Sequence, residues 1–428
     1  DSFTRAWVSV ERTGKISHAL KNAWQHSPLY PELIAELTEK RLGSISAQDL
    51  ETLMAQYPDS AAIANLRWKK LFRLGRANWY KDFLFLYRPT DSVELNCYKL
   101  EARYRLKQAK DADHREAVRL WTHGKSQPKA CDTLFSLIQQ RGLITKEVRL
   151  RRIDHALEKR QLQLARWLAK PLDQSATKHI NAWAQARRQP AAFLTKQAAQ
   201  FPEWVDMAAS RLASRNPDRL LELIKNREIS DAVREQAILG AARTMAINLD
   251  PAAAPLLRMD LPSHPILNHW RVRYFIHFQE WADVLTAISQ LAPEERNEIE
   301  WNYWASRALA MTGSSELAFE GFRKVAESNS WYGFLAADYL AISYTLTPKT
   351  KRPTESLITT VNQRTDVTVA RLLFEEGLTV MARRQWNFVT GRLDEEEQKA
   401  AAVLANRWNW HSRSAVTAHQ SGLTDDYE

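Results

Sequence analysis

The chain has 428 residues, of which 45% are hydrophobic and 26% are charged, as in an ordinary globular protein. Lysine and arginine (60 residues) outnumber aspartate and glutamate (50 residues), so the formal net charge is +10. No stretch approaches the roughly 18 consecutive apolar residues that a membrane-spanning helix needs, and we expect no membrane span.

The sequence favours helices throughout. Glycine is scarce, with 12 residues, which argues against a sheet protein with many tight turns. Short amphipathic segments alternate with proline, glycine, asparagine or aspartate. These breaks fall at residues 27–28, 43–44, 57–58, 88–89, 142, 170–171, 189–190, 216–217 and 250–251. The rhythm predicts an all-α stack of helical hairpins.

The chain contains two cysteines, Cys97 in ELNCYKLEARYRL and Cys131 in LWTHGKSQPKACDTLF, which are 34 residues apart. A disulfide between them would stabilise the fold by about 3.5 kcal/mol in the chain-entropy picture. It would also imply an oxidising compartment, such as a periplasm, and a signal peptide removed just before Asp1. Two unpaired thiols that pack as small hydrophobic side chains are the alternative, and the residues alone leave both open.

Positive charge and tryptophan are both spread along the chain. The densest basic runs, at residues 149–160, 186–189 and 349–352, are short, and we interpret them as solvated helix faces rather than a polyanion site. Sixteen tryptophans are present, and we interpret those on helical apolar faces as core rather than as a sugar-stacking surface. They are Trp7, Trp68, Trp79, Trp121, Trp167, Trp270, Trp281, Trp301 and Trp304.

The pattern of hairpins is strongest at residues 281–326. Small and aromatic residues there suit a tetratricopeptide-like hairpin, in which small side chains let two helices approach and aromatic rings fill the groove. They are Trp304, Ala305, Ala308, Gly313, Ala318, Phe322 and Ala326. Because the period is irregular elsewhere, we predict a degenerate helical repeat that stacks into a superhelix.

The composition changes at residues 345–356, TLTPKTKRPTES, which are polar and lack apolar periodicity. This pattern predicts a linker between domains. About three further helices follow, and Asp394 is predicted to cap the start of the last one. The chain then stops at Glu428 directly after a helix, and we expect more protein to follow there.

Residues 120–135, LWTHGKSQPKACDTLF, together with NCY at Cys97, resemble the periplasmic soluble lytic transglycosylases of Gram-negative bacteria. In that family a similar pattern surrounds the second of two bridged cysteines, so the resemblance implies a disulfide between Cys97 and Cys131. Residues 330–340, SWYGFLAADYL, resemble a block near the end of the family's helical superhelix. Residues 370–410 are similar in layout to its small linker domain.

The resemblance implies a ring- or U-shaped α-superhelix over residues 1–350, a helical linker domain over residues 351–428, and a lysozyme-like catalytic domain after residue 428. The family cleaves peptidoglycan between N-acetylmuramic acid and N-acetylglucosamine and leaves 1,6-anhydromuropeptides. One glutamate, followed by serine, acts first as the general acid and then as the general base.

The catalytic motifs of the family are missing from this chain. Glu-Ser occurs at Glu327-Ser328 and Glu355-Ser356, but neither pair precedes the family's Gly-Leu-Met-Gln and Ala-Tyr-Asn blocks. We therefore treat both pairs as chance matches and predict no catalytic residue. The dispersed histidines and the absence of a His-Glu-x-x-His motif predict no metal site, and no cofactor is expected.

We therefore predict a periplasmic, non-catalytic scaffold of a lytic transglycosylase. Its expected partners are glycan strands, bound weakly by a concave basic surface, its own catalytic domain and other cell-wall proteins; nucleic acid is not expected. The alternative is a stand-alone helical-repeat scaffold that binds a protein partner and has no cell-wall chemistry.

Overall fold

A computed structural model of the chain describes residues 2–346 and 351–423. Within these two ranges the regular elements are helices and none is a strand, which confirms the all-α prediction. No helix in the described part is long and apolar enough to span a bilayer. Contacts divide the chain into two compact units: unit 1 combines Asp1–Val148 with Pro348–Glu428, and unit 2 is Arg149–Thr347.

Unit 1 contains the helices at both ends of the sequence. The N-terminal set is α1 (Phe3–Thr13), α2 (His18–Trp24), α3 (Tyr30–Lys40), α4 (Ala47–Gln56), α5 (Ala61–Arg76), α6 (Tyr80–Leu86), α7 (Val93–Arg105), α8 (Asp111–Trp121), the 3-10 turn η1 (Lys129–Cys131), α9 (Asp132–Gln140) and the start of α10 (Lys146–Glu158). The C-terminal set is α24 (Glu355–Asn362), α25 (Thr365–Glu375), α26 (Thr379–Thr390), α27 (Glu395–Arg407) and α28 (His411–Gln420).

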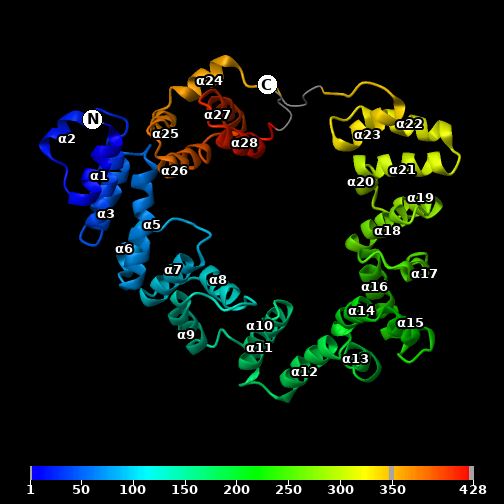
Figure 1. The fold of residues 1–428 in the computed structure, drawn as a ribbon. Coiled ribbons are helices and arrows are strands. Elements are labelled where there is room, and N and C mark those ends of the chain that lie inside the picture. The colour runs from blue at the N-terminus through cyan, green and yellow to red at the C-terminus, as the bar shows by residue number, and fades with distance from the viewer. Residues whose placement is uncertain (1, 347–350, 424–428) are drawn as a thin grey trace. The chain divides into compact units, whose positions relative to one another are not determined.

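Unit 2 is a stack in which each helix packs mainly on its neighbours in sequence. Its elements are the rest of α10, α11 (Leu162–Ala169), α12 (Gln174–Arg188), α13 (Pro190–Lys196), η2 (Pro202–Trp204), α14 (Val205–Arg215), α15 (Pro217–Lys225), α16 (Asp231–Ile247), η3 (Pro251–Ala253), α17 (Ala254–Leu257), α18 (Pro265–His277), α19 (Trp281–Ser289), α20 (Pro293–Arg296), α21 (Ile299–Met311), α22 (Ser315–Ala326) and α23 (Trp331–Leu340). Figure 1 shows this run in green to yellow.

The helix boundaries follow the punctuation of the sequence. Every predicted break falls between two helices or at the first residue of one. Serine, threonine, aspartate or asparagine side chains accept a first-turn N–H at many helix starts, which satisfies a donor that has no partner inside the helix. Such caps are Ser46, Ser60, Ser92, Asp173, Asn216, Ser330, Thr354 and Asp394.

The hairpin predicted at residues 281–326 is present. Helices α21 and α22 pack against each other after a turn at Gly313, whose φ of 88° favours glycine. Ala308, Ala318 and Phe322 are buried in it. Residues 293–311, which the sequence suggests as one continuous helical segment, form two helices: α20 ends at Arg296 and α21 begins at Ile299.

The family-like block around Gly333 shows why that position is glycine. Ser330 caps α23 by accepting the N–H of Gly333 at 3.2 Å. A Cβ on Gly333 would lie 1.9 Å from the carbonyl oxygen of Ser328, which is far inside van der Waals contact. The block therefore lets α23 approach the end of α22 closely.

The C-terminal set of helices is larger than predicted. The three predicted helices correspond to α25, α26 and α27, and Asp394 caps α27 by accepting the N–H of Glu397 at 2.8 Å. Helices α24 and α28 are additional. Trp386, 1% exposed, donates its indole N–H to Thr417 of α28 at 2.9 Å. This contact helps to hold α28 in place although the sequence of α28 is mostly polar.

The prediction that the tryptophans form core is wrong for three of them. Trp121 and Trp301 are buried, but Trp68, Trp79 and Trp167 are 42%, 55% and 56% exposed. A helical apolar stripe is wider than the strip that a neighbouring helix covers, so rings at its edge stay in contact with solvent.

Candidate functional site

Cys97 and Cys131 form a disulfide that links α7 to η1, directly before α9. Their Cα atoms are 5.0 Å apart and both side chains are fully buried. The GKSQP segment lies in the loop just before η1, at residues 124–128. The cross-link therefore fixes one end of the stretch that carries the family-like pattern.

The two ends of the sequence share one apolar core in unit 1. Phe3 and Leu33, from α1 and α3, belong to the same buried cluster as Val367, Leu373 and Trp386, from α25 and α26. In Figure 1 the orange and red C-terminal helices lie beside the blue N-terminal ones, with α26 against α5. This packing brings together side chains that are more than 300 residues apart.

An ion pair between a buried carboxylate and a partly exposed arginine crosses this contact. Arg384 of α26 donates to Glu32 of α3 at 3.0 Å, and Ser60 donates to the other carboxylate oxygen at 3.4 Å. Glu32 is 2% exposed. Burial raises the pKa of Glu32, and the guanidinium of Arg384 together with the Ser60 hydroxyl opposes that rise.

Gln385 adds three hydrogen bonds at the same place. Its amide oxygen accepts the N–H of Ala61 at 2.8 Å, and its amide nitrogen donates to the carbonyls of Asp59 at 2.7 Å and Asp366 at 3.1 Å. Gln385 is fully buried. Because Ala61 opens α5, its N–H has no partner within the helix and needs this one. We call Glu32, Ala61, Arg384 and Gln385 the joint.

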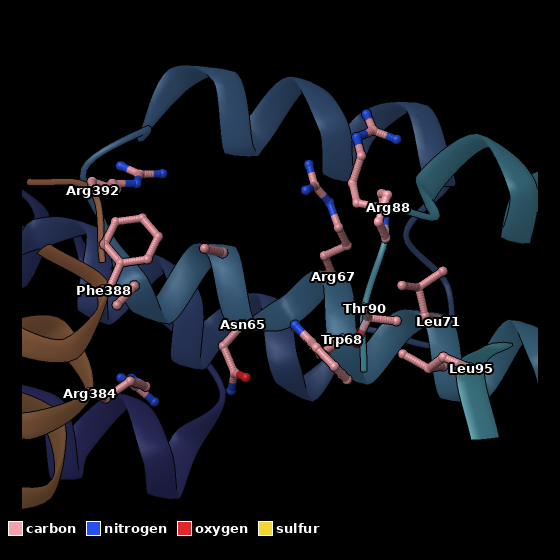
Figure 2. A pocket seen from close by; sticks show the side chains of 13 residues that line it. Asn65, Arg67, Trp68, Leu71, Arg88, Thr90, Leu95, Arg384, Phe388 and Arg392 are labelled. Carbon is pink, nitrogen blue, oxygen red and sulfur yellow. The ribbon is translucent and has the colours of Figure 1, made fainter. Parts of the chain in front are cut away.

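A pocket of about 360 Å³ lies next to the joint, between α5, the loop after α6, and α26. Four arginines line it: Arg67 of α5 and Arg88 of the loop after α6 on one side, and Arg384 of α26 and Arg392 just after α26 on the other. Figure 2 shows these two pairs at opposite ends, with Asn65 and Trp68 between them. The remaining lining residues are Ala61, Ala64, Leu71, Pro89, Thr90, Leu95 and Phe388. We call it the arginine pocket.

The arginine pocket carries an excess of positive charge. None of its lining residues, all of which the structure describes, is acidic. Glu51 pairs with both Arg67 (3.3 Å) and Arg88 (3.0 Å). Arg392 donates to the carbonyl of Pro58 at 2.9 Å and lies 3.7 Å from the centre of the Phe388 ring. Each end therefore has two guanidinium groups and one carboxylate partner, Glu51 or Glu32.

A second pocket of about 510 Å³ shares Pro89 and Thr90 with the first. His123 and Gln127, beside and within GKSQP, line it. Its lining carries two carboxylates, Asp91 and Glu116, and one arginine, Arg119, whose two hydrogen bonds to Glu116 lower the pKa of Glu116. The family-like loop thus borders a hollow that shares two lining residues with the arginine pocket.

The structure gives neither Glu-Ser pair the surroundings of a general acid, which needs a raised pKa in a cleft. Glu327 is exposed at the end of α22. Glu355 is exposed at the start of α24, where its hydrogen bond with Arg407 lowers the pKa of Glu355. Across the described ranges, no group of three or more histidine, cysteine or acidic side chains could hold a metal ion.

The basic runs are only partly solvated. In the run at 149–160, Arg152 is 5% exposed, and burial, with a smaller effect of Arg149, lowers the pKa of Arg152 to about 10. The interpretation of this run as a solvated helix face is therefore wrong for Arg152, while Arg151, Glu158, Lys159 and Arg160 are exposed. The run at 349–352 lies partly outside the described residues.

Neither the joint nor the arginine pocket is apparent from the sequence. Arg384 and Gln385 stand in a polar Arg-Arg-Gln triplet inside α26, next to the buried Trp386. The local signal is a glutamine directly before a tryptophan on the apolar face of a helix. It does not identify the partners on α3 and α5.

Comparison with known proteins agrees with this architecture. Residues 360–426 match the family described as "Soluble lytic murein transglycosylase L domain". The soluble lytic murein transglycosylase of Salmonella typhimurium is 25% identical over 354 residues, which are 78% of this chain and 54% of that protein. That of Escherichia coli K12 is 23% identical over 400 residues, 90% of this chain and 61% of that protein.

Two solved structures share the fold over nearly the whole chain. The lytic transglycosylase Slt of Pseudomonas aeruginosa, an inactive mutant, has a TM-score of 0.81 at 26% identity and matches 99% of this chain and 71% of its own. The 70-kDa soluble lytic transglycosylase of Escherichia coli has a TM-score of 0.80 at 20% identity and matches 99% and 70%. The chain spans less than two thirds of the curated relatives that it matches. The chain is therefore similar to soluble lytic murein transglycosylases over most of its own length, and residues 360–426 match their L domain.

Proposed function

We propose that this chain is the non-catalytic frame of a periplasmic lytic transglycosylase. Residues 1–350 would form its superhelical domain and residues 351–428 its linker domain. A separate lysozyme-like domain would cleave between N-acetylmuramic acid and N-acetylglucosamine, and the frame would hold that domain and the glycan strand in place. The formal charge of +10 would attract the anionic peptide stems at long range.

The observation that carries the proposal is the joint. A frame must hold its linker domain in one position, and Glu32, Arg384 and Gln385 fasten α26 to α3 and α5 by buried polar contacts. Such contacts are costly to break without new partners, which favours one arrangement of these helices over others. The buried disulfide supports a location in an oxidising compartment.

The experiment is digestion of purified peptidoglycan sacculi with the 428-residue chain, followed by chromatography and mass spectrometry of the soluble products. A full-length lytic transglycosylase serves as the positive control. We expect no 1,6-anhydromuropeptides above the level of a sample without protein. Release at a rate close to that of the full-length enzyme would contradict the proposal, because it would place the chemistry in this chain.

A further inference from the structure

The arginine pocket has features of a built binding site rather than a gap in the surface. Its volume of about 360 Å³ falls within the range of about 300–1,000 Å³ that is usual for small-ligand sites. Its floor is the first half of α5, which Gln385 and Ser60 hold at its start. Its walls come from two segments of the chain that the joint keeps together.

The charges of the pocket define the chemistry of its ligand. Four guanidinium groups face two carboxylates, Glu51 and Glu32, so about one positive charge remains uncompensated at each end. Arginine binds carboxylates through paired N–H donors and suits this recognition better than lysine. A single small anion would meet only one end. A ligand with two separated carboxylates would meet both.

The middle of the pocket suits a peptide. Trp68 is 42% exposed and offers an aromatic face between the two ends, and Asn65 can both donate and accept a hydrogen bond. Leu71 and Leu95 are buried beneath the lining and support it. Backbone amides and short aliphatic side chains are the groups that such a surface accommodates.

We propose that the arginine pocket binds a short acidic peptide, with one carboxylate held by Arg67 and Arg88, another by Arg384 and Arg392, and the chain between them lying on Trp68. This site deepens the proposed function, since peptide stems of peptidoglycan are its natural source. The contacts that would hold the peptide come from the lining of the pocket and do not require the cell-wall role. A stem held here would anchor the glycan strand to the frame, away from the chemistry.

The test is isothermal titration calorimetry of the intact chain with the tripeptide Ala-Glu-Glu, its neutral counterpart Ala-Gln-Gln, and sulfate. We expect Ala-Glu-Glu to bind more tightly than either of the others by tenfold or more. Equal affinity for Ala-Gln-Gln, or equal affinity for sulfate, would overturn the proposal, because then the two separated carboxylates would not be recognised.

Variants locate the site. Arg88→Gln and Arg392→Gln should each weaken binding of Ala-Glu-Glu roughly tenfold, and Trp68→Ala should weaken it several-fold. The matched controls are Arg76→Gln on α5 and Arg383→Gln on α26, both exposed arginines outside the lining of the pocket. Thermal midpoints check that each variant is folded. If the controls weaken binding as much as the pocket variants, the peptide binds through general charge and the site assignment is wrong.

Co-sedimentation with sacculi distinguishes failure of this proposal from failure of the proposed function. If Ala-Glu-Glu binds the pocket but the chain does not sediment with sacculi, the pocket assignment holds and the cell-wall role fails. If the chain sediments with sacculi equally well as wild type and as the Arg88→Gln, Arg392→Gln double variant, the cell-wall role holds and the pocket assignment fails.

Discussion

Unit 2 is assembled from neighbours in sequence, such as α14 with α16 and α21 with α22, whereas unit 1 brings α26 onto α5 from the opposite end of the chain. Both units bury polar side chains, such as Arg152 and Arg271 in unit 2. The joint of unit 1 differs because the buried amide of Gln385 and the buried carboxylate of Glu32 join helices more than 300 residues apart. Apolar packing tolerates small shifts, while hydrogen bonds require fixed positions. The contrast indicates that buried hydrogen bonds fix the position of α26 on α3 and α5 in unit 1, whereas unit 2 is built from contacts between neighbouring helices.

The strongest way to break this contrast is Gln385→Leu. The substitution removes the partners of Ala61 N–H and of the carbonyls of Asp59 and Asp366 in a fully buried position. We expect a loss of roughly 3 to 9 kcal/mol in local stability, at about 1–3 kcal/mol for each of the three groups left without this partner. Hydrogen–deuterium exchange should rise in α5, α25 and α26 and stay unchanged in α14 and α16.

The matched control is Asn387→Leu, which makes the same kind of change at an exposed position of α26. It should leave exchange in α5 unchanged. Equal effects of the two variants would show that Gln385 does not fasten the helices.

The disulfide gives the next largest expected effect. Replacing both Cys97 and Cys131 by alanine should cost about 3.5 kcal/mol, because the unfolded chain regains the freedom of a 34-residue loop. Thermal denaturation should shift to lower temperature, with the increase in hydrogen exchange confined to α7, α8 and α9. A reducing agent should destabilise the wild type similarly and leave the double variant unaffected; a shift of the variant by the reducing agent would refute the assignment.

In unit 2 the matching experiment is Gly333→Ala. The added Cβ would overlap the carbonyl oxygen of Ser328, so α23 must move away from α22 at a cost of about 1–3 kcal/mol or more. Gly391→Ala is the control, since its Cβ would lie 3.3 Å from the nearest atom and its φ is −70°. Exchange should rise in α22 and α23 alone. A rise of exchange in α5 or α26 would contradict this prediction, because it would show that strain at Gly333 in unit 2 reaches the helices of unit 1.

The smallest expected effect is a pH dependence in unit 2. The hydrogen bond with Asp154 (2.8 Å), aided by Glu203 (3.0 Å), raises the pKa of His179 above 6.5. The protonated ring therefore contributes stability that is complete below pH 6.5 and is lost as the pH rises through the raised value. All three groups are partly exposed, so we expect about 1 kcal/mol or less.

Thermal midpoints of the wild type and of His179→Gln, measured from pH 5.5 to 8.5, test this prediction. The advantage of the wild type should be greatest below pH 6.5 and should shrink above it. A constant difference would show that His179 does not bridge the two carboxylates as a cation.

Local features of this fold were predictable from the sequence, and the long-range ones were not. The cap at Asp394 and the hairpin of α21 and α22 depend on residues close in sequence, so the pattern predicted both correctly. The pairing of Cys97 with Cys131 came from a resemblance, because spacing alone left it open. The helix α28 was missed since its polar sequence is ordered by contacts with Trp386 rather than by its own pattern.

The candidate site was out of reach of sequence reasoning for a physical reason. Glu32 and Arg384 are 352 residues apart, and neither side chain carries a local sign that the other is its partner. Arg67 on α5 and Arg392 in the turn after α26 look like ordinary charged surface residues until α26 packs on α5. Exposure of Trp68 was likewise decided by which neighbour covers the edge of its helix.

The most direct test of the account is co-sedimentation of the intact chain with purified sacculi, at low salt and at high salt. A basic frame that guides the anionic peptide stems should sediment with the sacculi at low ionic strength and should be largely released at high salt, because screening weakens attraction between exposed charges. A chain that stays in the supernatant at low ionic strength would contradict the cell-wall role and would favour a scaffold for a protein partner.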